Sequence, residues 1–238
     1  MTVPLAVMAS GGGTNLQALL DHEGAQRDRT GAAPLWRVAV VVSDREDAKA
    51  LERATDAGRE ARVVPAAGRA GEVVAADLLD AFRGAGAQVL VLAGYMRLVP
   101  EEVVTAYRDR IVNVHPALLP AYGGQGMYGR RVHEAVLERG GRVTGVTVHL
   151  VDERYDRGPI LAQWPVPVRP GDTPGQLEDR VRRTEHRLYP QVVDHVARCV
   201  EAGVDPTGLH PAGGTFMTVD DDDEDGAGEP RAEALGEP

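Results

Sequence analysis

The segment PLAVMASGGGTNLQALL, residues 4–20, contains the pattern that decides the fold. An apolar run at Pro4–Ala9 is followed at once by three glycines and by a stretch with helical spacing that begins at Thr14. A buried strand, a tight turn and a helix in this order are typical of an α/β sheet, in which ligands bind beyond the carboxyl ends of the strands. The segment therefore predicts a parallel sheet with a ligand site next to the glycines.

The same alternation continues through two thirds of the chain. Apolar runs rich in Val, Leu and Ala predict strands buried on both faces at Arg37–Ser43, Ala61–Pro65, Gln88–Ala93 and Arg110–Val114. Helices are expected at Thr14–His22, Asp47–Ala57, Gly71–Arg83 and Glu101–Tyr107, with N-caps at Thr14 and within Asp44–Asp47. Edge strands are expected at Val143–Val151 and Ile160–Val168, and a long amphipathic helix at about Thr173–Val200. The predicted fold class is α/β, a doubly wound, mostly parallel, Rossmann-like sheet.

Charge is distributed unevenly along the chain. The formal net charge of the 238 residues is −10, but residues 220–238 hold nine acidic residues against Arg231 alone. This composition predicts a catalytic domain at 1–200, a C-terminal extension at 201–219 and a disordered acidic tail at 220–238. The nearly neutral body offers no basic surface for nucleic acid, and no stretch approaches the ~20 apolar residues that span a bilayer.

The cysteine and lysine content of the chain limits the kinds of catalytic and metal site that it can contain. Cys199 is the single cysteine, so an internal disulfide or a cysteine-rich metal site is excluded. A Schiff base would have to use Lys49, the single lysine. The N-terminus lacks the basic region of a secretory signal. We expect a cytoplasmic monomer or homodimer whose partners are small-molecule substrates, with no metal, membrane or nucleic acid.

The glycine segment Ser10–Asn15 favours a phosphate site. Glycines let the backbone approach an anion, and a helix N-terminus presents free N–H groups at the positive end of its dipole. The Gly-Lys-Ser/Thr motif of nucleoside-triphosphate loops is missing. Leu16 replaces the third glycine of a dinucleotide fingerprint, and Asp44 comes 33 residues after Gly11 instead of the usual ~20. A plain tight turn remains the alternative.

A second group of polar residues follows the strand that ends at Val114. Asn113 and His115 are two positions apart, so their side chains lie on the same side of an extended chain. An amide beside an imidazole suits stabilisation of an oxyanion and proton transfer, while Pro116 stiffens the following loop. The acidic loop around Asp156 could bring a carboxylate to the imidazole, which would raise the histidine pKa. The alternatives are that the acidic loop is only a solvated turn and that His149 is a packed residue of its strand.

Four blocks occur in a fixed order: ASGGGTNLQAL at 9–19, VLAGYMRLV at 91–99, NVHPALLPAYGG at 113–124 and TGVTVHLVDERYDRGPI at 144–160. Together they resemble the phosphoribosylglycinamide formyltransferase family over about residues 3–200. The resemblance implies transfer of the formyl group of 10-formyltetrahydrofolate, a co-substrate, to the amine of glycinamide ribonucleotide (GAR) in purine biosynthesis. It also implies that neither a metal nor a covalent enzyme intermediate takes part.

The resemblance further implies a role for each matching residue. The catalytic residues would be Asn113, His115 and Asp156. GAR would contact Gly13, Thr14 and Asn15 through its phosphate and Glu185 through its ribose, with Arg182 as a second phosphate contact. The folate would contact Met96, Arg97, Leu98, Val99 and Asn113, with the Val151–Gly158 loop closing the pterin pocket. His149 would support Asp156.

The segment after Pro120 departs from many family members. The segment AYGGQGMYGRRVHEAVL, residues 121–137, is longer and rich in glycine, which predicts a flexible or tightly turned lid followed by a helix with a structural His133.

Relatives with the same fold carry out other formyl chemistry. A tRNA formyltransferase needs a further basic C-terminal domain, and a formyltetrahydrofolate deformylase typically has an extra N-terminal domain. Sugar-nucleotide formyltransferases lack this phosphate-loop block. A dinucleotide-dependent oxidoreductase and a non-catalytic binding module are the alternatives outside the family.

Overall fold

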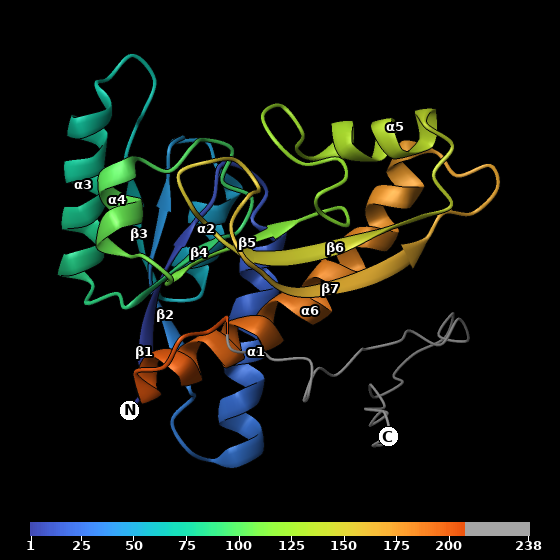
Figure 1. Ribbon diagram of the computed structural model, residues 1–238. Helices are drawn as coiled ribbons and strands as arrows, with labels where there is room; N and C mark the ends of the chain where they lie inside the picture. Colours follow the sequence, from blue (N-terminus) through green and yellow to red (C-terminus); the bar gives the residue numbers. More distant parts are fainter. Residues whose placement is uncertain (208–238) are drawn as a thin grey trace.

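The computed structural model describes residues 1–207, apart from the side chains of residues 29 and 30. The predicted acidic tail at 220–238 and most of the 201–219 extension lie outside the described residues. The elements in chain order are β1 Val3–Met8, α1 Thr14–Thr30, β2 Trp36–Ser43, α2 Lys49–Asp56, β3 Glu60–Val63, α3 Gly71–Gly84, β4 Val89–Leu92, α4 Glu101–Ala106, β5 Ile111–His115, α5 Arg130–Glu138, β6 Val143–Leu150, β7 Ile160–Pro167 and α6 Pro174–Ala202 (Figure 1).

The strands form one sheet in the order β3-β2-β1-β4-β5-β6-β7. Strands β1 to β5 run parallel, and β6 and β7 are antiparallel to their neighbours. The predicted mostly parallel α/β sheet is thus confirmed. Because the chain order reverses between β1 and β4, the connections diverge there and leave a crevice beyond the carboxyl ends of these strands.

Helices cover both faces of the sheet (Figure 1). Leu5 and Val7 of β1 point into a core shared with α1, α2, α5 and α6. Ala6 and Met8 of the same strand point into a second core, shared with α3 and α4. Burial on both faces explains why the central strands have continuous apolar runs and not alternating ones. The prediction that Ala61–Pro65 is buried on both faces is wrong, because β3 lies at the edge of the sheet and is exposed along its length.

Two predicted N-caps are wrong. Helix α1 begins at Thr14, but its N-cap is Gly13, at φ 68°, and α2 is capped by Ala48. A Cβ on Gly13 would lie 2.8 Å from the Ala50 Cα, so this close approach of two helices requires glycine. Asp47 pairs with Arg45 and is not a cap. Helix α1 also extends to Thr30, well beyond the predicted end at His22.

The prediction that Val143–Val151 is an edge strand is also wrong. Strand β6 pairs with β5 on one side and β7 on the other, and it is buried from Thr144 to Leu150. Its polar residues face protein groups, since the Thr147 hydroxyl donates to the Ala117 carbonyl at 2.6 Å and accepts from the Leu119 N–H at 3.0 Å. The alternation in the sequence therefore comes from polar residues that are buried, of which Thr147 has its hydroxyl hydrogen-bonded. Strand β7 is an edge, as predicted.

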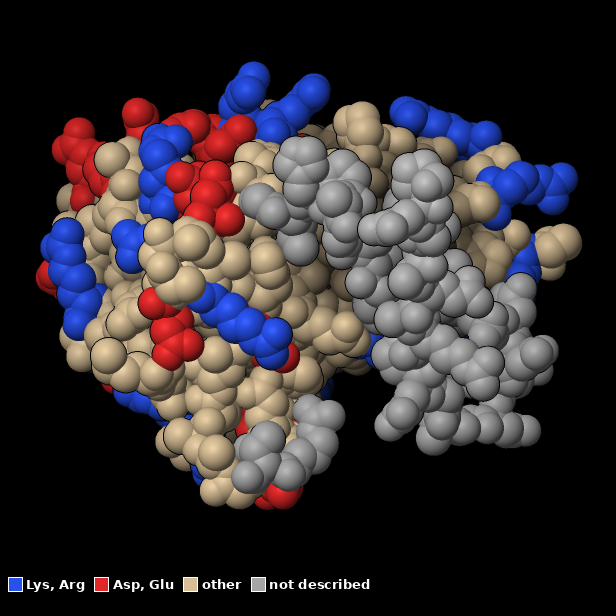
Figure 2. All heavy atoms as spheres, turned by 60° about the horizontal axis from the view of Figure 1, so that its bottom comes forward, with Lys and Arg blue, Asp and Glu red and all other residues tan. Residues whose placement is uncertain are grey.

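Helix α6 is confirmed as a long helix, and Thr173 and Gln176 form a capping box at its start. Within residues 1–207, no helix is both long and apolar enough to cross a membrane. On the face drawn in Figure 2, basic and acidic side chains are interspersed over the left half, in keeping with the nearly neutral composition of the body.

Tyr189 joins α6 to the sheet. Its hydroxyl lies 3.0 Å from the Leu92 carbonyl at the carboxyl end of β4 and 2.9 Å from the Val112 carbonyl of the neighbouring β5. The side chain is fully buried, so no water replaces the hydroxyl when it is removed. This contact fixes α6 against the part of the sheet where the crevice opens.

Tyr189→Phe is expected to lower the free energy of unfolding by about 1–3 kcal/mol, because two buried carbonyls lose a donor. Urea denaturation followed by circular dichroism measures the change. Tyr155→Phe is the control, since the Tyr155 hydroxyl makes no hydrogen bond to the described residues and its side chain is partly exposed. Equal stability of the two variants would contradict this account.

Candidate active site

A cavity of about 660 Å³ opens beyond the carboxyl ends of β1, β4 and β5. It is lined by side chains and backbone from all four blocks of sequence singled out above. The predicted site residues that line it are Gly13, Thr14, Asn15, Met96, Arg97, Leu98, Val99, Asn113, His115, Pro116, His149, Asp156, Arg182 and Glu185. Every side chain predicted for the site therefore meets in one cavity, at the place where the strand order reverses.

The glycine loop forms one wall of this cavity. Gly11 accepts a hydrogen bond from the Ala50 N–H at 3.1 Å, and Gly12 accepts one from Arg53 Nε at 2.9 Å. Ser10 Oγ accepts from the Met96 N–H at 2.9 Å, which joins this loop to the segment after β4. No side chain caps the start of α1, so its first N–H groups remain open to an anion in the cavity.

Asn15 and Glu185 contact each other in the cavity lining next to the glycine loop. Asn15 Nδ2 donates to Glu185 Oε2 at 2.9 Å, while the buried Asn15 Oδ1 has no partner among the described residues. Burial raises the pKa of Glu185 to about 7, against the opposing effects of the Asn15 hydrogen bond and the Arg182 charge. A carboxyl with a raised pKa therefore contacts Asn15, next to the glycine loop, with Arg182 one turn earlier on α6.

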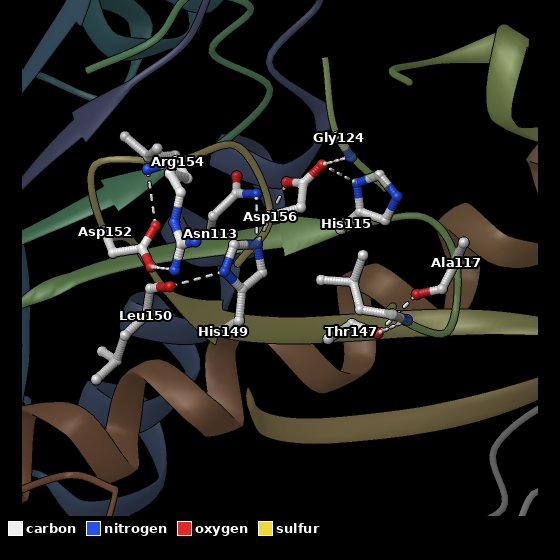
Figure 3. A network of polar contacts seen from close by, with 12 residues as sticks. Asn113, His115, Ala117, Gly124, Thr147, His149, Leu150, Asp152, Arg154 and Asp156 are labelled. Carbon is white, nitrogen blue, oxygen red and sulfur yellow. Dashed lines mark hydrogen bonds and ion pairs between the residues drawn. The ribbon is translucent and has the colours of Figure 1, made fainter. Parts of the chain in front are cut away.

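Asn113, His115 and Asp156 come together at the end of β5 (Figure 3). Asp156 lies in the loop between β6 and β7, and its Oδ2 is 3.6 Å from His115 Nδ1. The same oxygen accepts a hydrogen bond from the Gly124 N–H at 2.8 Å. Asp156 Oδ1 is 3.6 Å from His149 Nε2. The carboxylate thus lies between two imidazoles and a backbone amide.

Hydrogen bonds to carbonyls fix the tautomers of the two histidines. His149 Nδ1 lies 2.7 Å from the Leu150 carbonyl, which can only accept, so Nδ1 carries a proton. In the neutral ring, His149 Nε2 then accepts from Asn113 Nδ2 at 3.0 Å. His115 Nε2 lies 2.9 Å from the Tyr122 carbonyl, so it donates there. The Nδ1 lone pair of a neutral His115 therefore faces Asp156.

The expected rise in the His115 pKa is wrong. Burial, which leaves the residue 3% exposed, lowers the pKa of His115 and outweighs the nearby charge of Asp156, which raises it. Burial also acts to raise the pKa of Asp156, but the nearby His149 and His115 imidazoles and the Gly124 amide together lower it. At neutral pH the site therefore holds a carboxylate and a neutral His115.

The segment predicted to bind folate has two different parts. Met96 and Leu98 expose nearly half of their side chains, and Arg97 pairs with Asp44 at 2.7 Å. Val99 is buried in the core under α3 and α4, so its side chain supports the inner wall of the cavity and does not lie at the cavity opening. Gly158 closes the opposite loop tightly, because a Cβ there would lie 2.0 Å from the Leu150 carbonyl oxygen.

The glycine-rich segment after Pro120 is tightly turned. Gly124, Gly126 and Gly129 adopt positive φ angles, and a Cβ on Gly123 would lie 2.5 Å from a Leu119 methyl group. His133 was expected to be structural, but this buried residue also lines the cavity. The sequence did not reveal the Gly124 N–H or the Tyr122 carbonyl, because backbone groups leave no signal in residue type. Among the described residues, no cluster of His, Cys, Asp and Glu has the arrangement of a metal site.

Comparison with known proteins gives consistent matches. The formyl transferase family matches residues 3–193. The chain is 44% identical over 191 residues to the chloroplastic phosphoribosylglycinamide formyltransferase of Arabidopsis thaliana, covering 79% of this chain and 63% of the relative. It is 34% identical over 194 residues to phosphoribosylglycinamide formyltransferase of Escherichia coli K12, covering 81% and 86%. The chain thus spans less than two thirds of the plant relative's length and most of the bacterial one.

Solved structures agree with this match. Glycinamide ribonucleotide transformylase 1 from Symbiobacterium toebii superimposes with a TM-score of 0.74 at 42% identity, covering 83% of this chain and 88% of that one. The enzyme of the same name from Geobacillus kaustophilus gives 0.70 at 39% identity, covering 84% and 99%.

We expect His115 to titrate below its ordinary pKa of 6.5, and Asp156→Asn to lower that pKa further by removing the charge that raises it. Imidazole resonances followed by NMR between pH 4 and 8 measure both values, and His115→Gln assigns the signal. Asp77→Asn, on α3 outside the cavity, should leave the titration unchanged. An increase in the His115 pKa on removal of Asp156 would contradict the electrostatic account.

The raised pKa of Glu185 makes folding stability depend on pH. Since the folded-state pKa is about 7 and the ordinary value is 4.5, the folded state binds more protons between these pH values. The stabilising contribution is complete below about pH 4.5 and is lost as the pH rises through about 7. Glu185→Gln should therefore gain stability relative to the wild type across this range, measured by urea denaturation at each pH. A constant difference would refute the assignment.

Proposed function

The chain belongs to the formyl transferase family, and we propose that it transfers the formyl group of 10-formyltetrahydrofolate to the amine of GAR. One observation carries the proposal: an anion-binding helix start and the group of Asn113, His115 and Asp156 line the same cavity. The names of the bacterial and plant relatives and of the solved structures support the choice of substrate.

The two substrates would enter from different sides of the cavity. The GAR phosphate would bind the N–H groups of Gly13–Asn15 with Arg182 nearby, and Glu185 would accept from the ribose hydroxyls. This placement directs the glycinamide amine toward Asn113 and His115. The folate would lie against Met96–Val99, with the Val151–Gly158 loop over the pterin. Holding both reactants together supplies the orientation part of the acceleration.

Asn113 is placed to stabilise the transition state. As the amine nitrogen attacks the formyl carbon, a C–N bond forms and negative charge develops on the formyl oxygen. Asn113 Nδ2 uses one N–H toward His149, which leaves its other N–H for that oxygen. The tautomer of His149 thereby keeps the amide nitrogen, and not the amide oxygen, on the reacting side.

His115 is placed to move the proton. The neutral ring accepts a proton from the attacking amine at Nδ1, and the adjacent Asp156 carboxylate stabilises the imidazolium. Developing charge on the formyl oxygen also favours that protonated form. The proton then passes to N10 of the folate as the bond between N10 and the formyl carbon breaks. The products are formyl-GAR and tetrahydrofolate, and no bond to the enzyme is formed.

The direct test is release of tetrahydrofolate from 10-formyltetrahydrofolate, which should depend strictly on added GAR. Release without GAR would indicate a deformylase instead. His115→Ala and Asp156→Asn should lower kcat by about 10²- to 10⁴-fold, since each removes part of the proton transfer.

Binding of GAR to the same variants should change by less than about threefold, because the phosphate loop is untouched. Isothermal titration measures this binding, and Asp77→Asn serves as a carboxylate control outside the cavity. Wild-type turnover in both catalytic variants would contradict the assigned roles.

A further inference from the structure

Helix α5 begins at the cavity with an unusual arrangement of charge. Gly129, its N-cap, provides no side-chain cap, and the first turn contains no acidic residue. Instead, the helix starts with Arg130 and Arg131 at the positive end of its own dipole. Placing cations at this end is unfavourable unless an anion binds there, so the sequence breaks a local rule at the edge of the site.

Arg131 differs from the other arginines of the cavity wall. Arg97, Arg154 and Arg182 each have a carboxylate partner, in Asp44, Asp152 and Asp179 respectively. Within residues 1–207, Arg131 makes neither an ion pair nor a hydrogen bond, although it lines the cavity. Its guanidinium carbon lies 5.1 Å from the centroid of the Tyr128 ring, which restricts the side chain without neutralising it.

The same helix carries a second polar group without a partner. His133 is 2% exposed and lines the cavity, and its Nδ1 makes no hydrogen bond to the described residues. Burial, together with the His115 charge, lowers the pKa of His133 to about 4, so the ring is neutral at pH 7. A buried polar atom without a partner is rare in native proteins, and here it lines a cavity from which a polar ligand can reach it.

The neighbours of α5 show which other elements share its part of the cavity wall. Helix α5 packs against α6, and α6 also packs against α1 (Figure 1). From α6, Arg182 and Glu185 reach the cavity, and α1 contributes its open N-terminus. The start of α5 therefore shares the cavity wall with the N-terminus of α1 and with Arg182 and Glu185 of α6.

We propose that Arg131 is a further anion contact, in addition to Arg182, that binds the phosphate of the ribonucleotide substrate from the side opposite the glycine loop. This inference rests on the proposed function. The phosphate would lie between the N-terminus of α1 and the N-terminus of α5, with the Arg131 guanidinium supplying the charge that the backbone amides lack. Arg131 would thus determine affinity for the phosphorylated substrate without touching the reacting atoms.

The matched pair Arg131→Gln and Arg130→Gln tests this proposal. Arg130 lies in the same turn but pairs with Glu134 and does not line the cavity. We expect Arg131→Gln to raise the KM for GAR about tenfold, as loss of one charge-assisted hydrogen bond does, and to leave kcat and the KM for the folate within about twofold. Arg130→Gln should behave as wild type, and Arg131→Lys should restore part of the affinity.

Inorganic phosphate gives a reading that does not depend on turnover. It should bind the wild type in competition with GAR in a titration, and its Kd should rise by the same factor in Arg131→Gln. An unchanged affinity for GAR and phosphate would overturn the proposal, and a rise confined to the KM of the folate would reassign Arg131 to the folate carboxylates. A wild type that releases no tetrahydrofolate with GAR, yet loses phosphate binding in Arg131→Gln, would overturn the proposed function alone.

Discussion

A single buried carboxylate connects the separate parts of the site. Asp156 contacts His115 of β5, His149 of β6 and the backbone of Gly124, which come from three regions of the chain. Its own backbone adopts φ 53°, in the left-handed region that aspartate enters more readily than most residues other than glycine. The carboxylate has no arginine or lysine partner among these contacts, and the hydrogen bond that it accepts is the one from the Gly124 N–H.

Burial and charge act in opposite directions on this group, and their balance decides the resting protonation state. Dehydration of His115 outweighs the attraction of Asp156, so the ring stays neutral while its Nδ1 faces an anion. A neutral ring next to a carboxylate can accept a proton and then be stabilised as a cation, whereas a ring that is already charged could only donate. The resting state therefore suits the step in which the amine must lose a proton.

Sequence reasoning predicted which residues meet in the cavity, but it did not predict their electrostatics. The strand–helix order, the glycine loop and the spacing of Asn113 and His115 are local patterns, and each gave a correct position. The helix caps and the edge assignment of β6 failed because they depend on packing between distant segments, such as Gly13 against Ala50. The direction of the His115 pKa also failed, since a neighbouring carboxylate is visible in a motif but the depth of burial is not. Backbone partners such as the Tyr122 carbonyl leave no trace in residue type.

The register of α6 carries a consequence for how related chains can vary in length. Glu185 and Tyr189 are one helical turn apart and face the same side, one toward the cavity and the other toward the ends of β4 and β5. A single-residue insertion between them would rotate one against the other by about 100°. A deletion in this turn would likewise separate the contact between Asn15 and Glu185 from the contact between Tyr189 and the sheet.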